Sequence, residues 1–232
     1  MRPAPLLLLF DIDGTLLRRA TAEHAQALRE AAAAVHGVPA LDGLRVEAAG
    51  RTDGAIVRDL LGLAGVEGAA ADARWGEVQA AAVEAYARLC PADLSGTVAP
   101  GVRELLAELA ARPQTFRLSL VTGNLEPVAR LKLARAGLGG HFASGQGAFG
   151  SDHPEREALP AIARARAGDP PWPRERTAVI GDTPRDIACA RADGVRVAAV
   201  ATGPFDVAAL ADADAVVDDA RALLPVLDDW AR

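Results

Sequence analysis

Several polar residues stand where they could carry out chemistry on a charged substrate, each at the end of an apolar run. Asp11 and Asp13 follow the first run, and Thr122 ends a second. The third run is followed by Asp182 and Asp186. Carboxylates held close together repel one another unless a cation or a shared proton offsets their charge. Oxygen ligands with no cysteine or histidine nearby favour Mg²⁺, so the pattern predicts a magnesium site that also accepts a phosphate group.

The apolar runs themselves have the pattern of strands that are buried on both faces. They span residues 6–12, 117–122 and 177–181, and segments with helical spacing separate them. A short strand over 142–144 and a helix over 207–211 are also expected. Alternating strands and helices form a parallel sheet with helices on both faces, and ligands bind beyond the carboxyl ends of the strands. We therefore expect an α/β fold with a doubly wound, Rossmann-like parallel sheet.

The chain between the first strand and the second has a different character. Residues 20–90 are rich in Ala, Leu, Glu and Arg, and no buried strand is expected there. Apolar spacing and the Gly and Pro breaks predict three helices, over residues 21–35, 52–61 and 70–89. We therefore expect an all-helical cap domain over residues 18–95, inserted into a core domain made of residues 1–17 and 96–232.

Composition limits the classes of function. The net charge of −6 argues against broad nucleic-acid binding, which needs a basic face. The first apolar run is too short to cross a bilayer. The two cysteines have neither metal-ligand spacing nor a disulfide framework. We expect a cytoplasmic monomer or homodimer whose partner is a small phosphorylated substrate and that binds neither nucleic acid nor membrane.

Three motifs, in this order and at this spacing, carry a family resemblance. They are Asp11-x-Asp13-Gly14-Thr15-Leu16, Thr122-Gly123-Asn124 and Gly181-Asp182-Thr183-Pro184-x-Asp186. The sequence resembles the haloacid dehalogenase superfamily over residues 5–18 and about 95–230. Its helical insertion resembles the cap of the phosphoglycolate phosphatase and β-phosphoglucomutase branch. The resemblance implies a Mg²⁺-dependent phosphatase that hydrolyses a small-molecule phosphomonoester through an aspartyl-phosphate.

The resemblance also implies a role for each motif residue. Asp11 would be the nucleophile. Asp13 would give a proton to the leaving alcohol and later take one from the attacking water. The metal would be bound by Asp11, the backbone carbonyl of Asp13 and Asp182, with Asp186 as a further ligand or as a partner of one. Thr122 would hydrogen-bond the transferring phosphoryl group.

Contacts to the substrate are expected from Gly14, Gly123 and Asn124 in the core and from Arg51 in the cap. The segment Gly50-Arg51-Thr52-Asp53 precedes a predicted helix and resembles the substrate-specificity loop of this cap type. A phosphate binds readily at a helix N-terminus with an arginine beside it. Arg51 is therefore the expected cap cation.

One expected cation is missing from its usual place. The family has a lysine, occasionally an arginine, between the second and third motifs, where it neutralises phosphate charge. Arg156 lies 26 residues before Asp182 at a predicted helix start, so we expect it to be this cation. Arg164 and Arg166 are second choices. Lys132 is the only lysine of the chain, and we expect it to sit too late on its helix to reach the strand ends easily.

Three other functions are compatible with parts of this pattern. A phosphosugar mutase of the β-phosphoglucomutase type would share the core motifs and return the phosphoryl group to a sugar. A metal-independent haloacid dehalogenase would share Asp11 but would not use an acid at position 13. A non-catalytic module that senses a phosphorylated ligand would be expected to lack catalytic acids, and this chain has them.

Overall fold

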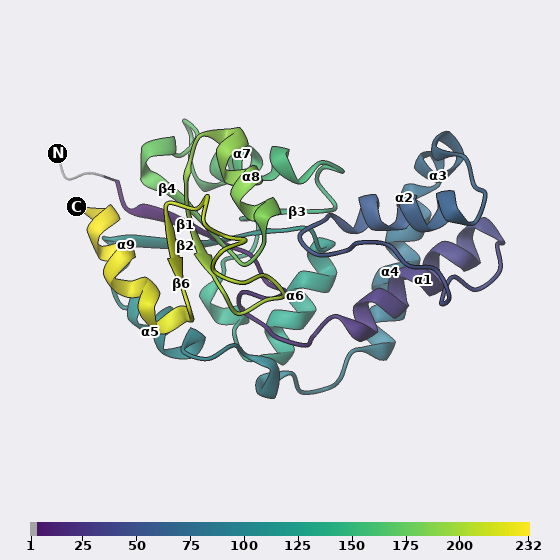
Figure 1. Ribbon diagram of the computed structural model, residues 1–232, viewed down its shortest axis with the longest axis horizontal. Coiled ribbons are helices and arrows are strands. Elements are labelled where there is room, and N and C mark those ends of the chain that lie inside the picture. Colours follow the sequence, from purple (N-terminus) through teal and green to yellow (C-terminus); the bar gives the residue numbers. More distant parts are fainter. Residues whose placement is uncertain (1–3) are drawn as a thin grey trace.

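The computed structural model describes residues 4–232, and a parallel β-sheet forms its centre (Figure 1). Six strands lie in the order β3-β2-β1-β4-β5-β6, and each neighbouring pair is parallel. The strands are β1 (Leu6–Phe10), β2 (Phe116–Thr122), β3 (Ala148–Phe149), β4 (Thr177–Gly181), β5 (Arg196–Val200) and β6 (Ala215–Val217). Because the chain adds strands on both sides of β1, the sheet is doubly wound, which confirms the predicted fold class.

β1 lies in the middle of the sheet because all five of its residues are apolar and buried. Successive side chains of a strand point to opposite faces. Leu6 and Leu8 therefore join one hydrophobic cluster, and Leu7 and Leu9 join a second on the other face. This arrangement fixes the carboxyl end of β1, followed by Asp11, at the centre of the functional edge of the sheet.

Helices cover both faces of the sheet, as Figure 1 shows. On one face pack α5 (Val102–Ala110), α6 (Glu126–Arg135) and α9 (Leu223–Ala231). On the other face pack α7 (Leu159–Ala167) and α8 (Pro184–Asp193). Short 3-10 helices lie in the connections: η1 (Ser95–Thr97), η2 (Gly139–His141), η3 (Arg156–Ala158), η4 (Arg174–Arg176) and η5 (Ala220–Ala222).

The helical insertion lies beyond the carboxyl ends of the strands, at the right of Figure 1. It contains α1 (Ala22–His36), α2 (Asp53–Leu63), α3 (Gly68–Ala73) and α4 (Trp75–Leu89). The single helix expected over 70–89 is wrong at its start, because the backbone leaves helical geometry at Arg74 (φ −111°, ψ 12°). Helices α1 and α4 pack along each other, and the cap places α1 and the start of α2 above the sheet edge.

Two further expectations of secondary structure are wrong. Residues 142–144 form no strand; the apolar Phe142 is buried instead as a loop residue whose ring packs edge-on against Phe10, with the ring centroids 6.2 Å apart. Residues 207–211 form turns in place of a helix, and the Asp206 carboxylate accepts a hydrogen bond from the Ala209 amide there at 2.9 Å. Across residues 4–232, every helix is too short or too polar to cross a membrane.

Candidate active site

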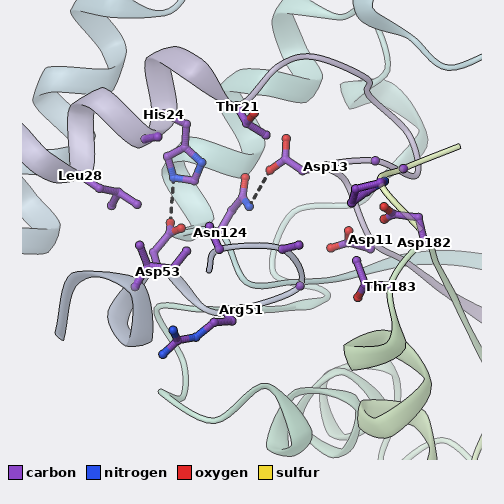
Figure 2. A pocket seen from close by; sticks show the side chains of 18 of the residues that line it. Asp11, Asp13, Thr21, His24, Leu28, Arg51, Asp53, Asn124, Asp182 and Thr183 are labelled. Atoms are coloured by element: carbon purple, nitrogen blue, oxygen red, sulfur yellow. Dashed lines mark hydrogen bonds and ion pairs between the residues drawn. The ribbon is translucent and has the colours of Figure 1, made fainter. Parts of the chain in front are cut away.

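A cavity of about 470 Å³ lies between the cap and the carboxyl edge of the sheet (Figure 2). Asp11, Asp13 and Asp182 line it from the core. The cap contributes apolar side chains such as Leu28 and Ile56. The carboxylates therefore lie at the core side of a partly open cavity that is large enough for a small molecule.

Three aspartates converge at the core side of this cavity, although 171 to 175 residues separate the first from the others. Asp11 follows β1, and Asp182 and Asp186 follow β4, the neighbouring strand. One carboxylate oxygen from each lies within 4.8 Å of the others, and all three residues are buried. Parallel strands bring their carboxyl ends to the same edge, which explains the convergence.

The crowding of these carboxylates shows in their pKa values. Burial raises the pKa of Asp11 to about 7, against the Arg156 charge, which lowers it. Burial also raises the pKa of Asp182 to about 8, and the charges of Asp11 and Asp186 add to the rise. Protein groups therefore do not supply enough positive charge to keep all the carboxylates ionised at neutral pH.

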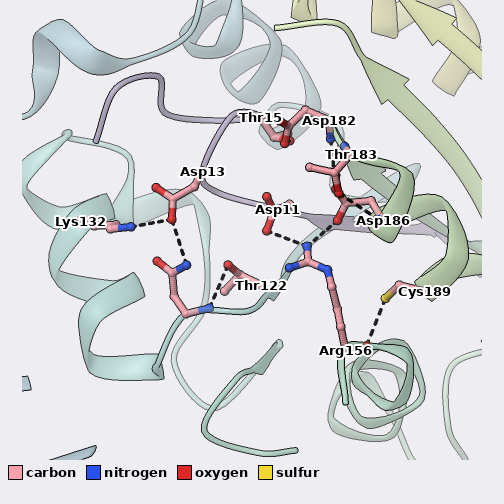
Figure 3. Close-up of polar contacts among 11 residues, drawn as sticks. Asp11, Asp13, Thr15, Thr122, Lys132, Arg156, Asp182, Thr183, Asp186 and Cys189 are labelled. Atoms are coloured by element: carbon pink, nitrogen blue, oxygen red, sulfur yellow. Dashed lines mark hydrogen bonds and ion pairs between the residues drawn. The ribbon is translucent and has the colours of Figure 1, made fainter. Parts of the chain in front are cut away.

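One oxygen of the Asp182 carboxylate has no hydrogen-bond partner among the described residues, and two glycines lie against the carboxylate. Thr15 Oγ1 donates a hydrogen bond to its Oδ1 at 3.0 Å, whereas Oδ2 is buried and has no hydrogen-bond partner in residues 4–232 (Figure 3). A Cβ atom on Gly14 or on Gly203 would collide with this carboxylate. An orphaned carboxylate oxygen among other carboxylates fits a hard cation such as Mg²⁺. Gly203 was not among the residues selected from the sequence.

Arg156 lies against the carboxylate cluster from below, as Figure 3 shows. Its Nη2 donates to Asp11 Oδ1 at 2.9 Å and also pairs with Asp186 Oδ1. The side chain is buried, and the start of η3 directs it toward the end of β1. The two second choices lie elsewhere, since Arg164 pairs with Asp193 and Arg166 pairs with Asp152.

Asp186 uses both of its oxygens within the protein. Its Oδ2 accepts hydrogen bonds from the Thr183 amide at 3.0 Å and the Thr183 hydroxyl at 2.7 Å. The Asp186 amide in turn donates to Thr183 Oγ1 at 3.2 Å, which completes a capping box at the start of α8. The Asp182 amide also donates to Asp186 Oδ2 at 3.2 Å. Because its Oδ1 pairs with Arg156, Asp186 holds Asp182 and Arg156 in place.

Asp13 lies in a different environment, and Lys132 is part of it. The expectation that Lys132 could not easily reach the strand ends is wrong, because its Nζ lies 2.5 Å from Asp13 Oδ2 (Figure 3). Side chains of a helix lean toward its N-terminus, and the N-terminus of α6 faces this edge of the sheet. Asn124 Nδ2 donates to the same oxygen at 2.9 Å. Burial raises the pKa of Asp13, but the Lys132 charge and the hydrogen bonds from Lys132 and Asn124 offset this effect, and the pKa lies below its ordinary value.

Two cap residues that the sequence did not single out also belong to this group. His24 Nδ1 lies 3.1 Å from Lys132 Nζ, and His24 Nε2 lies 3.0 Å from Asp53 Oδ2 (Figure 2). The sequence carried one signal for this group: Lys132 is a single lysine in a chain whose other basic residues are 24 arginines. The position of this single lysine was therefore the feature of the sequence that could have pointed to the group.

Of the remaining predicted site residues, Arg51 lines the cavity, whereas Thr122 and Gly123 do not. Thr122 is fully buried, and its Oγ1 accepts a hydrogen bond from the Asn124 amide at 3.4 Å. Gly123 gives room to the cap, because a Cβ atom there would collide with the Arg51 carbonyl. The Arg51 side chain extends away from Asp11 and pairs with Asp59 at 2.5 Å (Figure 2).

Comparison with known proteins agrees with this geometry. Residues 8–191 match the family model described as haloacid dehalogenase-like hydrolase. A phosphoglycolate phosphatase from Rhodospirillum rubrum is 31% identical over 200 residues, which are 86% of this chain and 80% of that protein.

Solved structures share the fold at lower identity. A putative β-phosphoglucomutase from Bacteroides vulgatus superposes with a TM-score of 0.65 at 22% identity, covering 99% of this chain and 91% of the other. CbbY from Rhodobacter sphaeroides in complex with phosphate superposes with a TM-score of 0.63 at 21% identity, covering 97% and 99%. Because the family model spans most of the chain and includes the aspartates that line the cavity, this protein belongs to the haloacid dehalogenase-like hydrolases.

Proposed function

We propose that this protein is a phosphatase that hydrolyses a small-molecule phosphomonoester through a covalent phosphoryl group on Asp11. The observation that carries the proposal is the placement of Asp11 at the core side of the cavity, between the Arg156 guanidinium and the buried Asp182, with Asp13 on the cavity side. A carboxylate nucleophile, a charge-neutralising cation and a second, separately held carboxylate are the groups that this chemistry requires.

The first half of the reaction transfers the phosphoryl group to the protein. An Asp11 carboxylate oxygen attacks phosphorus, and the bond between phosphorus and the alcohol oxygen breaks. Asp13 donates a proton to that oxygen, so that the product leaves as an alcohol. Arg156 lies 2.9 Å from Asp11 and neutralises negative charge as the new bond forms.

The second half returns Asp11 to its free state. Asp13, now ionised, takes a proton from water, and the water oxygen attacks phosphorus. The bond between phosphorus and the Asp11 oxygen breaks, and inorganic phosphate leaves. The pKa of Asp13 is held below its ordinary value, mainly by the Lys132 charge against its burial, which favours the ionised form needed in this half.

A divalent cation fits the remaining groups. Asp11, Asp182 and the backbone carbonyl of Asp13 would hold Mg²⁺, and the orphaned Oδ2 of Asp182 supports this assignment. When bound, the ion neutralises charge on the phosphoryl oxygens and on the carboxylates. Asp186 then acts through its hydrogen bonds to the Asp182 amide and to Arg156.

The cavity lining favours a substrate with a second anionic group. Arg18, Arg19 and Arg29 line the cavity, and none of the three is paired with a carboxylate in residues 4–232. Apolar side chains, such as Leu28 and Ile56, line the same cavity. Phosphoglycolate, the substrate in the name of the bacterial relative, carries a carboxylate besides its phosphate. We therefore place phosphorylated small carboxylic acids first among the candidate substrates.

A panel of phosphomonoesters with Mg²⁺, with and without EDTA, tests the proposal. The panel contains phosphoglycolate, sugar phosphates, nucleoside monophosphates and p-nitrophenyl phosphate, and the Asp11→Asn variant is the matched control. Release of phosphate that needs Mg²⁺ and Asp11 is the expected result. Absence of turnover on every member would instead support a ligand-sensing module.

A phosphosugar mutase is the second candidate, because solved structures with this fold include a putative β-phosphoglucomutase. Feeding a hexose 1-phosphate with a trace of bisphosphate separates the two, since a mutase gives isomer without free phosphate. Chloride released from a haloacid in the presence of chelator would point to the dehalogenase.

A further inference from the structure

Lys132 is a buried cation that contacts both Asp13 in the core and His24 in the cap. Its side chain is 0% exposed, and its Nζ lies 2.5 Å from Asp13 Oδ2 and 3.1 Å from His24 Nδ1. The Tyr86 ring centroid lies 5.9 Å from the same atom. A buried ammonium is costly unless every donor has a partner. The fold therefore surrounds this charge with three contacts, to Asp13, His24 and Tyr86.

The choice of lysine matches these three contacts. The other 24 basic residues of the chain, outside histidine, are arginines, so arginine is the ordinary cation of this protein. An ammonium presents three donors around one atom, whereas a guanidinium is a larger planar fork. Asp13, His24 and the face of Tyr86 surround a single point, which suits the smaller group.

The contact with Lys132 fixes the proton of His24. A lysine ammonium has only donors, so His24 Nδ1 must accept its hydrogen bond. The imidazole is then neutral with its proton on Nε2, which donates to Asp53 Oδ2 at 3.0 Å. A directed series of hydrogen bonds thus connects Asp13 in the core with Asp53 in the cap.

Asp53 stands where the cap rests on the core. Its amide donates to the Gly123 carbonyl at 2.8 Å, and the Leu125 amide donates to its Oδ2 at 2.7 Å. The neighbouring Thr52 hydroxyl donates to the Pro154 carbonyl at 2.6 Å. These bonds form only when the start of α2 lies on the core loops. The position of the cap and the acceptor for His24 are therefore linked.

We infer that Lys132 is a positioning residue for Asp13, and that the cap residues His24 and Asp53 hold Lys132 in place when the cap rests on the core. Lys132 and Asn124 both donate to Asp13 Oδ2, which leaves Oδ1 without a protein partner in residues 4–232. The fixed oxygen orients the carboxylate, and the other is free to exchange a proton with the leaving alcohol or the water. The inference rests on the proposed acid and base role of Asp13.

Lys132→Met tests the positioning role, because methionine keeps an unbranched stem and removes the ammonium. With the best alkyl phosphate of the panel, we expect kcat to fall ~10²-fold with little change in KM, since both halves of the reaction need Asp13. With p-nitrophenyl phosphate the leaving group needs no proton. Stopped-flow measurement should then show a rapid burst of about one nitrophenolate per active site, followed by slow turnover.

The control is Arg130→Met, which removes a cation from the same helix whose carboxylate partner is Glu126. It should leave both rates close to wild type. In Lys132→Met, the burst amplitude and the steady-state rate could instead fall by the same factor. That result would mean that the substitution only lowers the fraction of folded protein, and it would overturn the positioning role. An unchanged rate would also overturn it. A wild-type protein that turns over neither substrate would contradict the proposed function itself.

A second measurement tests the link to the cap without altering Lys132. Because Lys132 is the only lysine, a protein labelled with ¹⁵N-lysine gives a single ammonium signal. Asp53→Asn removes the charged acceptor of His24 and should shift this signal, with kcat for the alkyl phosphate reduced about 10-fold. Asp59→Asn, which breaks the Arg51 pair on the same helix, is the control. A Lys132 signal that is the same in Asp53→Asn as in wild type would rule out the link.

Discussion

Asp11 and Asp13 are two residues apart, yet the protein surrounds them with opposite charge. Around Asp11 lie the carboxylates of Asp182 and Asp186 with Arg156 as their shared cation, and its pKa is raised to about 7, first by burial. Around Asp13 lie the amide of Asn124 and the ammonium of Lys132, and its pKa is lowered. The group around Asp11 has more carboxylates than cations, whereas Asp13 is paired with the Lys132 ammonium.

The difference lies in the partners that the protein gives to each carboxylate of one motif. Two carboxylates whose surroundings push their pKa values apart are suited to different parts in a reaction, as we propose for Asp11 and Asp13. The group around Asp11 is made from core strands and loops and still has room for a cation. The group around Asp13 joins core to cap through Lys132 and His24. The cap therefore influences the second carboxylate more directly than the first.

The largest expected effect comes from substituting the two aspartates one at a time. Asp11→Asn should abolish turnover, because it removes the nucleophile, while circular dichroism shows an unchanged fold. Asp13→Asn should slow the release of phosphate from an alkyl ester ~10²–10⁴-fold, because it removes only proton transfer. Equal residual activity in the two variants would contradict the division of roles.

Removal of the metal should affect the Asp11 group alone. EDTA is expected to abolish turnover, and Mg²⁺ at about 100 times its Kd should add about 2.7 kcal/mol to the free energy of unfolding. The measurement is phosphate release together with thermal unfolding. Asp182→Asn should abolish the Mg²⁺ effect on unfolding. A stabilisation by Mg²⁺ that survives this change would place the ion elsewhere.

The same group gives a pH dependence of stability. Burial, with the charges of Asp11 and Asp186, raises the pKa of Asp182 from its ordinary 3.8 to about 8 in the metal-free protein. The folded state then binds more protons than the unfolded chain between these values, so this group makes stability fall as pH rises from about 4 to 8. Urea unfolding in EDTA at pH 6 and pH 8 should show the fall, and Mg²⁺ should reduce it. An equal pH dependence in Asp182→Asn would assign the fall to other groups.

Arg156→Ala should cost ~10²-fold in kcat, because the Asp11 group would lose its one paired cation among the described residues. Arg156→Lys keeps the charge and should recover part of the loss. Steady-state kinetics on the best substrate checks both variants. A rate near wild type for Arg156→Ala would show that the metal alone supplies the necessary charge.

The smallest effect is expected from Arg51, which lies outside both groups. Its pairing with Asp59 is largely at the surface, so Arg51→Ala should cost at most about 1 kcal/mol of unfolding free energy. The relative rates across the phosphomonoester panel should stay the same. A changed profile would show that Arg51 swings into the cavity when substrate binds.

The sequence alone predicted the fold and one of the two groups. The run of apolar residues before Asp11 predicted a fully buried strand, and β1 is that strand. The carboxylates of Asp182 and Asp186 follow a strand of the same kind, and parallel topology then requires them to lie near Asp11. Arg156 could be selected because the family resemblance implies a cation between the second and third motifs. Local patterns were sufficient for the carboxylates because each follows the end of a strand.

The tertiary structure decided the rest. Lys132 lies 119 residues from Asp13 and 108 from His24, and its reach depends on how α6 packs against the sheet and the cap. The direction of the Arg51 side chain likewise depends on its neighbour Asp59. Hydrophobic periodicity reports which face of an element is buried, but not which polar atoms of distant elements meet inside. The sequence therefore determined where Asp11 stands and at which edge of the sheet, whereas only the packing of cap on core determined what surrounds Asp13.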